Sequence, residues 1–174
     1  MGINVTTAPT ETPISVEDVK THSVIFISGD DAYIETLIGA ATAYAENYLG
    51  RSLCTQTLTL TLDAFPSVID LPRTPVQSVT SISYVDANGD SQAFTDYQSD
   101  LSGTLSHQIK PAPGFNWPDT REVFGAATVV YVAGYGAASD VPQDIKAALL
   151  LMVGSLYENR ENEVTGTIVS PLGF

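Results

Sequence analysis

The residue types that most often carry out chemistry are few in this sequence. The two histidines, His22 and His107, have no histidine or cysteine neighbour at the spacing of metal ligands. Cys54 is the only cysteine and has no histidine near it in the sequence, so neither a disulfide nor a cysteine-based zinc site can form within one chain. We therefore expect each histidine to be a hydrogen-bonded surface or core residue, and Cys54 to be buried or inert.

Three further patterns suggest chemistry at first sight, and each has a simpler structural explanation. Asp30 and Asp31 stand at the expected start of a helix, where negative charge complements the helix dipole. Residues 86–90 (Asp-Ala-Asn-Gly-Asp) resemble a calcium loop but lack its closing glutamate, since position 97 is Tyr97, and Asn-Gly indicates a hairpin. Residues 134–136 (Gly-Tyr-Gly) lack the lysine of a phosphate loop. We predict no catalytic residues, no cofactor and no metal site, and hence no enzyme.

The charge of the chain restricts its partners. Its 174 residues include 7 Lys and Arg but 20 Asp and Glu, which gives a formal net charge of −13. Proteins that hold nucleic acid through its phosphates need clustered cations, so this balance argues against that class. It does not exclude a surface past which DNA slides, because like charge prevents adhesion. The longest apolar helix is too short and too polar at its ends to span a bilayer, so we expect no membrane partner.

Three helices are expected to frame the chain. An apolar fraction of 44% supports one domain with a buried core. Residues 30–49 and 141–161 carry apolar side chains at helical spacing, so each predicts a long helix with one buried face. Residues 15–22 predict a short helix with Ser15 as its N-cap. We therefore predict a small helical bundle, preceded by an extended N-terminal arm over residues 1–13.

Between the two long helices the sequence period changes. Residues 52–136 contain runs that alternate apolar and polar side chains, most clearly at 57–62, and a period of two is typical of half-buried strands. We predict an inserted antiparallel β unit of five to six strands, and hence an α+β fold. One domain would then span residues 14–163, followed by a tail at 164–174. The expected strands are 57–62, 69–71, 76–84, 91–97, 105–109 and 127–133.

Short motifs occur in order along most of the chain. The first long helix ends in Gly50-Arg51, and the last strand runs into Gly134-Tyr135-Gly136. The other motif positions are Asp31, Ile34, Leu37, Ile38, Ala40, Ala41 and Glu46; Gln56, Thr57, Leu71, Pro72, Pro75, Val76, Val79, Ile82, Tyr84 and Gly89; Trp117, Pro118, Val130, Tyr131, Val132 and Ala133; and Val141, Pro142, Ile145, Lys146, Ala148 and 156–161. In order and spacing, over roughly residues 14–165, they resemble the head–tail connector, or adaptor, proteins of long-tailed bacteriophages and phage-like particles.

This resemblance implies a structural virion protein without catalytic activity. Members of the family form a ring, commonly of twelve subunits, beneath the portal protein at the capsid vertex. The ring extends the DNA channel and docks the next tail component. We therefore expect the chain to be made in the cytoplasm of a bacterial host and to lie in the virion neck, with the portal protein and a tail or stopper protein as partners. The acidic excess suits a channel through which double-stranded DNA passes without specific binding.

Two surfaces are predicted to contact these partners. The tail is expected to fold against the portal protein, because apolar side chains recur in it with no core of their own to join. These side chains are Val164, Ile168, Val169, Leu172 and Phe174. The alternative is a tail without a binding role.

The second surface is the end of the last helix, which is predicted to join neighbouring subunits in the ring. Glu158, Arg160 and Glu161 are candidates for ion pairs there, and Tyr157 is the candidate aromatic anchor. The alternative is a solvated helix end.

A function of another class also fits the sequence. The alternative is a soluble β-rich binding module, for example one for carbohydrate, that uses Trp117 as a stacking platform. The simpler interpretation is that Trp117, which precedes Pro118, packs at the edge of the β unit.

Overall fold

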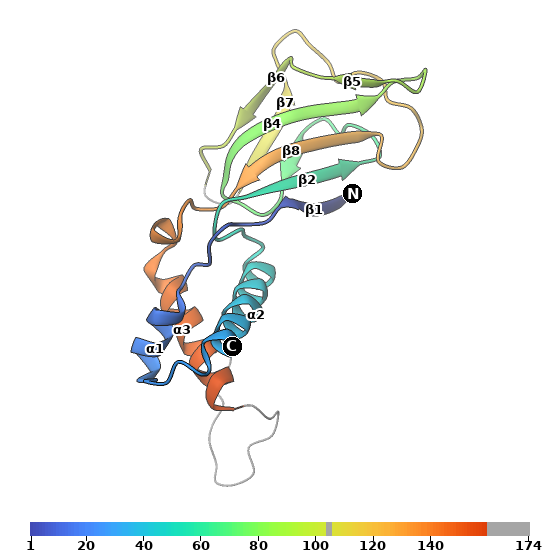
Figure 1. The fold of residues 1–174 in the computed structure, drawn as a ribbon. Helices are drawn as coiled ribbons and strands as arrows, with labels where there is room; N and C mark the ends of the chain where they lie inside the picture. The colour runs from blue at the N-terminus through green and yellow to red at the C-terminus, as the bar shows by residue number, and fades with distance from the viewer. Residues whose placement is uncertain (104–105, 160–174) are drawn as a thin grey trace, which may run out of the picture.

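The computed structural model of the chain describes residues 1–103 and 106–159. They form two bodies arranged end to end, a bundle of three α-helices and a β unit (Figure 1). The chain starts in the β unit, enters the bundle, returns to the β unit and re-enters the bundle at its last helix. The elements are β1 (Gly2–Thr7), α1 (Val16–Ser23), α2 (Asp31–Leu49), β2 (Gln56–Leu62), β3 (Ile69–Leu71), β4 (Val76–Val85), β5 (Ser91–Ala93), β6 (Tyr97–Asp100), β7 (His107–Pro111), β8 (Ala127–Ala133), a 3₁₀ turn (Ala138–Asp140) and α3 (Gln143–Glu158).

The helices begin and end at the residues that the sequence marks for these positions. The backbone N–H of Asp18 donates to Ser15 Oγ at 3.1 Å, and the backbone N–H of Ser15 donates to Asp18 Oδ2 at 2.8 Å, which forms a capping box at α1. The Ser15 hydroxyl also donates to Asp18 Oδ2 at 2.7 Å, and the two hydrogen bonds from the backbone N–H and the hydroxyl of Ser15 hold the pKa of the Asp18 carboxyl below its usual value. Helix α2 ends at Gly50, whose φ of 63° lies in the left-handed region that glycine adopts without strain. The three predicted helices are therefore confirmed, although the last one spans Gln143–Glu158 and is shorter than the predicted 141–161.

One apolar face of each helix builds the core of the bundle. Val19 of α1, Ile34 and Ile38 of α2, and Leu149 and Val153 of α3 are all buried. The single ion pair recorded among the described residues joins α1 to α2, with Lys20 Nζ 2.9 Å from Asp31 Oδ1. The bundle therefore has its own core, separate from that of the β unit.

The β unit consists of two antiparallel sheets that share one core. The larger sheet has five strands in the order β1-β2-β8-β4-β5, and the smaller has three in the order β3-β7-β6. In β2 and β8 every second residue is buried, as the alternation in the sequence predicts. Leu60 of β2 faces Val129 of β8 across the ladder, and both side chains are fully buried. The predicted α+β fold is confirmed.

The segment expected as an extended N-terminal arm is in part a strand of this sheet. Strand β1 pairs antiparallel with the outer edge of β2, from Gly2 opposite Thr61 to Thr7 opposite Thr57. Residues 3 and 5–7 are β-branched, which favours an extended backbone, and the edge of β2 supplies the strand with which this backbone pairs. The two prolines that suggested an arm, at positions 9 and 13, both lie beyond the strand.

The β unit also contains more strands than the five or six predicted, with seven between positions 56 and 133. The expected strand 91–97 is two strands, because the chain leaves the larger sheet after β5 and joins the smaller one at β6. Phe94 at this crossing donates its backbone N–H to Ile82 O at 2.9 Å, and its ring packs against the shared core. Local periodicity does not reveal this change of sheet, because the three residues of β5 are all exposed and show no alternation.

A compact junction connects the two bodies. The Glu46 carboxylate of α2 accepts hydrogen bonds from the backbone N–H of Leu53 at 2.8 Å and from Gln56 Nε2 at 3.0 Å. Gly134 has a φ of 120°, and a Cβ at this position would lie 2.3 Å from the carbonyl oxygen of Cys54. The backbone at Gly134 therefore crosses closely over that of Cys54, so the Gly-Tyr-Gly sequence after β8 has a structural role at the junction.

Candidate interaction surface

The residues with catalytic potential have structural roles. His107 is buried, and its Nδ1 accepts the backbone N–H of Val76 at 2.7 Å while its Nε2 contacts the carbonyl oxygen of Gly103. The ring therefore bridges two backbone segments with the proton on Nε2. Cys54 is buried at the junction, and desolvation raises the pKa of its thiol to about 11. These findings confirm the predictions of a hydrogen-bonded core histidine and a buried cysteine.

The Asp-rich loop at 86–90 closes on itself. Asp86 Oδ1 accepts the backbone N–H groups of Asp90 at 3.0 Å and Asn88 at 2.9 Å. The hydrogen bond from Asp90, followed by those from Gln92 and Asn88, holds the pKa of the Asp86 carboxyl below its usual value. Gly89 has the positive φ that the hairpin requires. Across the described residues no group of three or more His, Cys, Asp or Glu side chains is arranged to hold a metal ion. None of the helices in the same residues has the length and hydropathy of a bilayer span.

Trp117 belongs to an aromatic cluster at the edge of the β unit. Its indole ring stacks on Phe65 with the ring centroids 4.5 Å apart and lies 5.0 Å from Phe94 at an angle of 47°. Its Nε1 points to the carbonyl oxygen of Ser67 at 3.4 Å. The indole is thus in contact with the core of its own chain, which favours the packing role over a carbohydrate platform.

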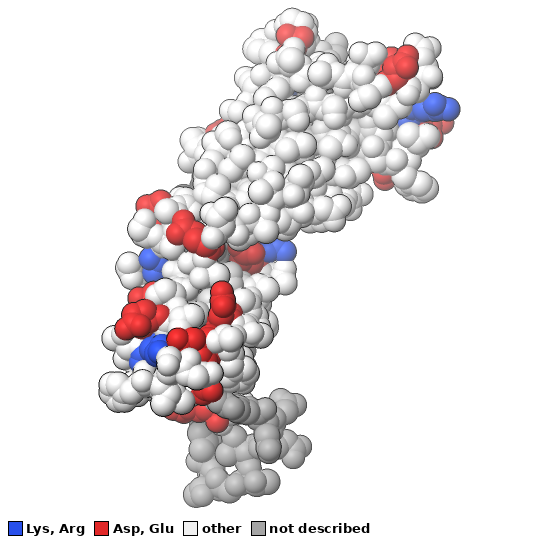
Figure 2. Space-filling view, viewed as in Figure 1, with Lys and Arg blue, Asp and Glu red and all other residues white. Residues whose placement is uncertain are grey.

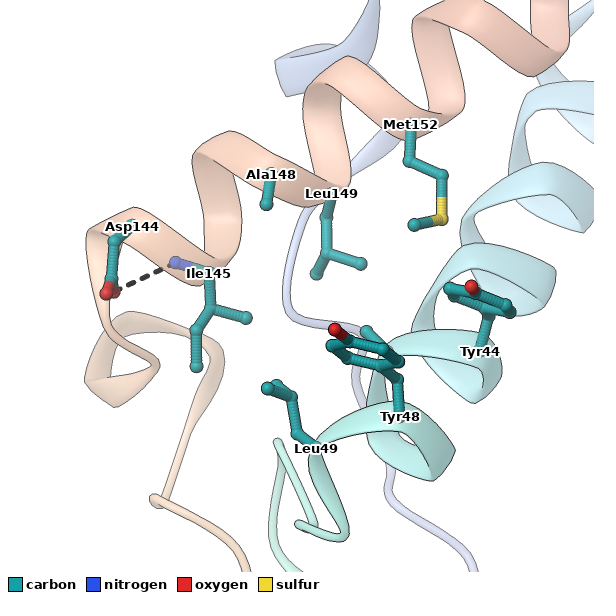
Figure 3. Close-up of a pocket in the computed structure, with 9 residues that line it drawn as sticks. Tyr44, Tyr48, Leu49, Asp144, Ile145, Ala148, Leu149 and Met152 are labelled. Atoms are coloured by element: carbon teal, nitrogen blue, oxygen red, sulfur yellow. Dashed lines mark hydrogen bonds between the residues drawn. The ribbon is translucent and has the colours of Figure 1, made fainter. Parts of the chain in front are cut away.

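An apolar groove runs between α2 and α3 on the bundle. Figure 3 shows Tyr48 and Leu49 of α2 facing Ile145 and Leu149 of α3 across this space. A hollow of about 390 Å³ lies here, and a second of about 400 Å³ continues beside Tyr44 towards the end of α3. The second hollow is lined by Ala40, Ala41, Tyr44, Met152, Ser155 and Leu156. We refer to the two hollows together as the α2–α3 groove.

The groove exists because the apolar surface of α2 is wider than its partner helices cover. Tyr44 and Tyr48 stack on each other at 6.3 Å and point away from the core, with 51% and 76% of their surfaces exposed. The sequence predicts one buried face for the helix at 30–49, but Tyr48 and Leu49, which continue its apolar stripe, are exposed. The sequence signal for this exposure was the width of the apolar stripe in residues 30–49, because a neighbouring helix covers only a narrower part of such a face.

The charge of the molecule is unevenly distributed on the face drawn in Figure 2. Acidic side chains gather over the helices, whereas the adjoining face of the β unit is mostly uncharged, with acids chiefly near its tip. On this face the acidic side chains lie mainly over the bundle (Figure 2), which is also the body that carries the apolar groove.

A model of one protein family matches residues 12–168, and that family is described as head completion protein. The chain belongs to the head completion protein family. Among solved structures, this member of the family is similar to a chain in the neck of an empty gene transfer agent particle computed with C6 symmetry. That match has a TM-score of 0.82 at 25% identity and covers 97% of this chain and 89% of the other. The comparison with curated proteins finds no match.

Two further solved structures share this fold. One is a chain in the neck of a native gene transfer agent particle computed with C12 symmetry, with a TM-score of 0.77 at 25% identity over 99% of this chain and 90% of the other. The other is a chain in the virion of a native gene transfer agent particle, with a TM-score of 0.81 at 24% identity over 99% and 91%. Together with the head completion family, these matches confirm the predicted structural role in the neck of a phage-like particle.

Of the predicted contact residues in this head completion protein, two are described. The Tyr157 hydroxyl donates to Asp30 Oδ2 at 2.6 Å, and its ring lies 6.2 Å from that of Tyr33, so Tyr157 fastens the end of α3 to the start of α2. Glu158 is exposed. The other predicted residues lie outside the described part of the chain: Arg160, Glu161, Val164, Ile168, Val169, Leu172 and Phe174.

Proposed function

We propose that the chain is a non-catalytic ring subunit of the virion neck, positioned beneath the portal protein. In this proposal twelve copies form a closed ring that extends the DNA channel and docks a tail or stopper protein. The observation that carries the proposal is the family match over residues 12–168 together with similar chains in particle necks. The C12 symmetry used for one of those necks supports the number twelve.

The charge of the chain supports the channel role. With a net charge of −13, the ring would repel the phosphate backbone, so DNA passes without adhering. We expect the purified protein to show no DNA retention even at low ionic strength, where phosphate contacts are strongest. Retention of duplex DNA at low salt that is lost as salt increases would contradict this part of the proposal.

The copy number in particles tests the ring directly. Quantitative mass spectrometry of purified particles, with isotope-labelled peptides of this chain and of the portal protein, should give equal copy numbers for the two. A chain that is absent from the particles, or present at a small fraction of the portal protein, would overturn the neck assignment.

The segment 164–174 is proposed to reach the portal protein. Apolar side chains recur in this segment without a charged residue among them, so a partner surface would cover them. Deleting residues 164–174 should abolish portal binding and leave the circular dichroism spectrum unchanged. Unaltered binding of the portal by a folded, deleted chain would remove this segment from the interface.

The end of α3 is proposed to join neighbouring subunits. Because the Tyr157 hydroxyl bonds to Asp30, it would present only part of its ring to a neighbour, and the exposed carboxylate of Glu158 remains available for an ion pair with Arg160 of the next copy. Arg160→Glu should reduce ring formation. Lys110→Glu on strand β7 is the matched control, because it reverses a charge away from this contact and should leave ring formation unchanged. Full rings from the Arg160→Glu variant would exclude this residue from the contact.

A further inference from the structure

The α2–α3 groove lacks a cover in the described part of the chain. Tyr44, Tyr48 and Leu49 expose between 42% and 76% of their surfaces on one wall, and Leu156 exposes 39% at the far end. Exposed side chains that line two adjoining apolar hollows, which share Tyr44 and Met152, mark a binding surface because they are not scattered. The predicted subunit contact at residues 157–161 lies beyond the groove lining, so that contact does not account for it.

The sequence places an uncharged, apolar segment directly after this groove. Residues 164–174 (Val-Thr-Gly-Thr-Ile-Val-Ser-Pro-Leu-Gly-Phe) contain no charged side chain, in a chain where 16% of residues are charged. A polar spacer, residues 159–163 (Asn-Arg-Glu-Asn-Glu), separates them from the end of α3. The chemistry of the segment therefore matches that of the groove.

The segment is long enough to fill the groove from its own chain. Helix α3 forms one wall and lines the groove from Asp144 to Leu156, a rise of about 18 Å at 1.5 Å per residue. The helix ends at Glu158, beside the second hollow. The spacer allows a reversal of direction, and the eleven residues that follow span up to about 36 Å when extended. The segment can therefore run back along the whole groove.

We propose that in the free protein residues 164–174 lie in the α2–α3 groove of the same chain. Their apolar side chains would pack on Tyr48, Leu49 and Met152. Attachment through a short spacer gives the segment an effective concentration of about 1 mM, which favours its own groove over that of another copy. The inference also rests on the proposed function, in which the same segment contacts the portal protein. Groove and portal then compete for it, and the free chain keeps it covered until a portal is present.

Photo-crosslinking of the full-length chain tests this proposal. We would replace Tyr48, which is 76% exposed, with the photoreactive residue p-benzoylphenylalanine. Phe124, which is 96% exposed on the β unit, is the matched control position. At about 10 μM protein, irradiation should join position 48 to a peptide from 164–174 within a product of monomer mass, at least about tenfold more often than from position 124.

The other outcomes overturn the proposal. In a mixture of ¹⁵N-labelled and unlabelled chains, a cross-link between two chains, for example to the exposed loop at 24–27, would assign the groove to a second copy. Absence of any cross-link to 164–174 would leave the segment outside the groove.

Ile168→Asp with Val169→Asp should remove the product, whereas Thr165→Asp with Thr167→Asp should retain it. No portal protein is present in this assay, so its failure leaves the proposed portal contact intact, and failed portal binding would leave the cross-link intact.

Discussion

The β unit and the helical bundle each have a core, but they differ in how completely they cover it. In the β unit two sheets enclose the apolar side chains, and Phe65, Phe94 and Trp117 pack over the core at its edge. In the bundle three helices bury their inner faces and leave the α2–α3 groove open. The β unit thus covers its core with its own sheets and aromatic side chains, whereas the bundle leaves an apolar groove that a further segment can cover.

The largest predicted effect is a difference in the free energy of unfolding between two tyrosine-to-alanine substitutions, one in each body. Tyr131 of β8 is fully buried, and its hydroxyl donates to the carbonyl oxygen of Pro72 at 2.8 Å. Tyr131→Ala should lower the free energy of unfolding by about 4 kcal/mol, because it leaves a cavity in the β core. Tyr48 of the bundle, which only residues 164–174 are proposed to cover, is the matched control, and Tyr48→Ala should cost about 1 kcal/mol. Urea denaturation measures both values, and equal losses would remove the distinction between the bodies.

A smaller effect is expected where the two bodies meet. Gly134→Ala places a Cβ against the carbonyl oxygen of Cys54 at a φ of 120°, so it should lower the free energy of unfolding by about 2 kcal/mol. Gly39→Ala on α2 is the matched control, because nothing lies within 4 Å of the added Cβ. In that helix interior the substitution should increase stability by about 0.5 to 1 kcal/mol. If Gly134→Ala increased the stability as Gly39→Ala should, the junction would tolerate a side chain at position 134.

The smallest expected effect lies at the edge of the bundle. Asp18→Ala removes one half of the capping box at α1 and should cost about 1 kcal/mol at pH 7. Because the pKa of Asp18 is lower in the folded chain, its stabilisation is complete above its unfolded pKa and is lost as the pH falls through the folded one. The difference between wild type and variant should therefore shrink below about pH 4.

Glu17→Ala, which removes a charge in the same turn without touching the cap, is the control and should cost less than about 0.5 kcal/mol. Chemical denaturation at several pH values measures both variants. A difference between wild type and Asp18→Ala that is independent of pH would contradict the capping role of the carboxylate.

Much of this architecture could be predicted from local patterns. The apolar stripe and Gly50 marked α2, Ser15 marked the start of α1, and the alternation at 57–62 marked β2, because each of these signals lies within one element. Strand β1 was missed because its pairing depends on β2, whose paired residues are 50 to 59 positions away. The α2–α3 groove was missed for a similar reason. Periodicity shows which side of a helix is apolar, but only packing shows how much of that side the neighbouring helices cover.

The central claim is that this chain is a neck subunit that assembles with the portal protein, and a mass measurement tests it most directly. Light scattering and native mass spectrometry would give the mass of the purified protein alone and after mixing with the portal ring. We predict either a ring of the chain by itself or a monomer that joins the portal in about a one-to-one ratio of subunits. A chain that stays monomeric and does not bind the portal at micromolar concentration would contradict the claim.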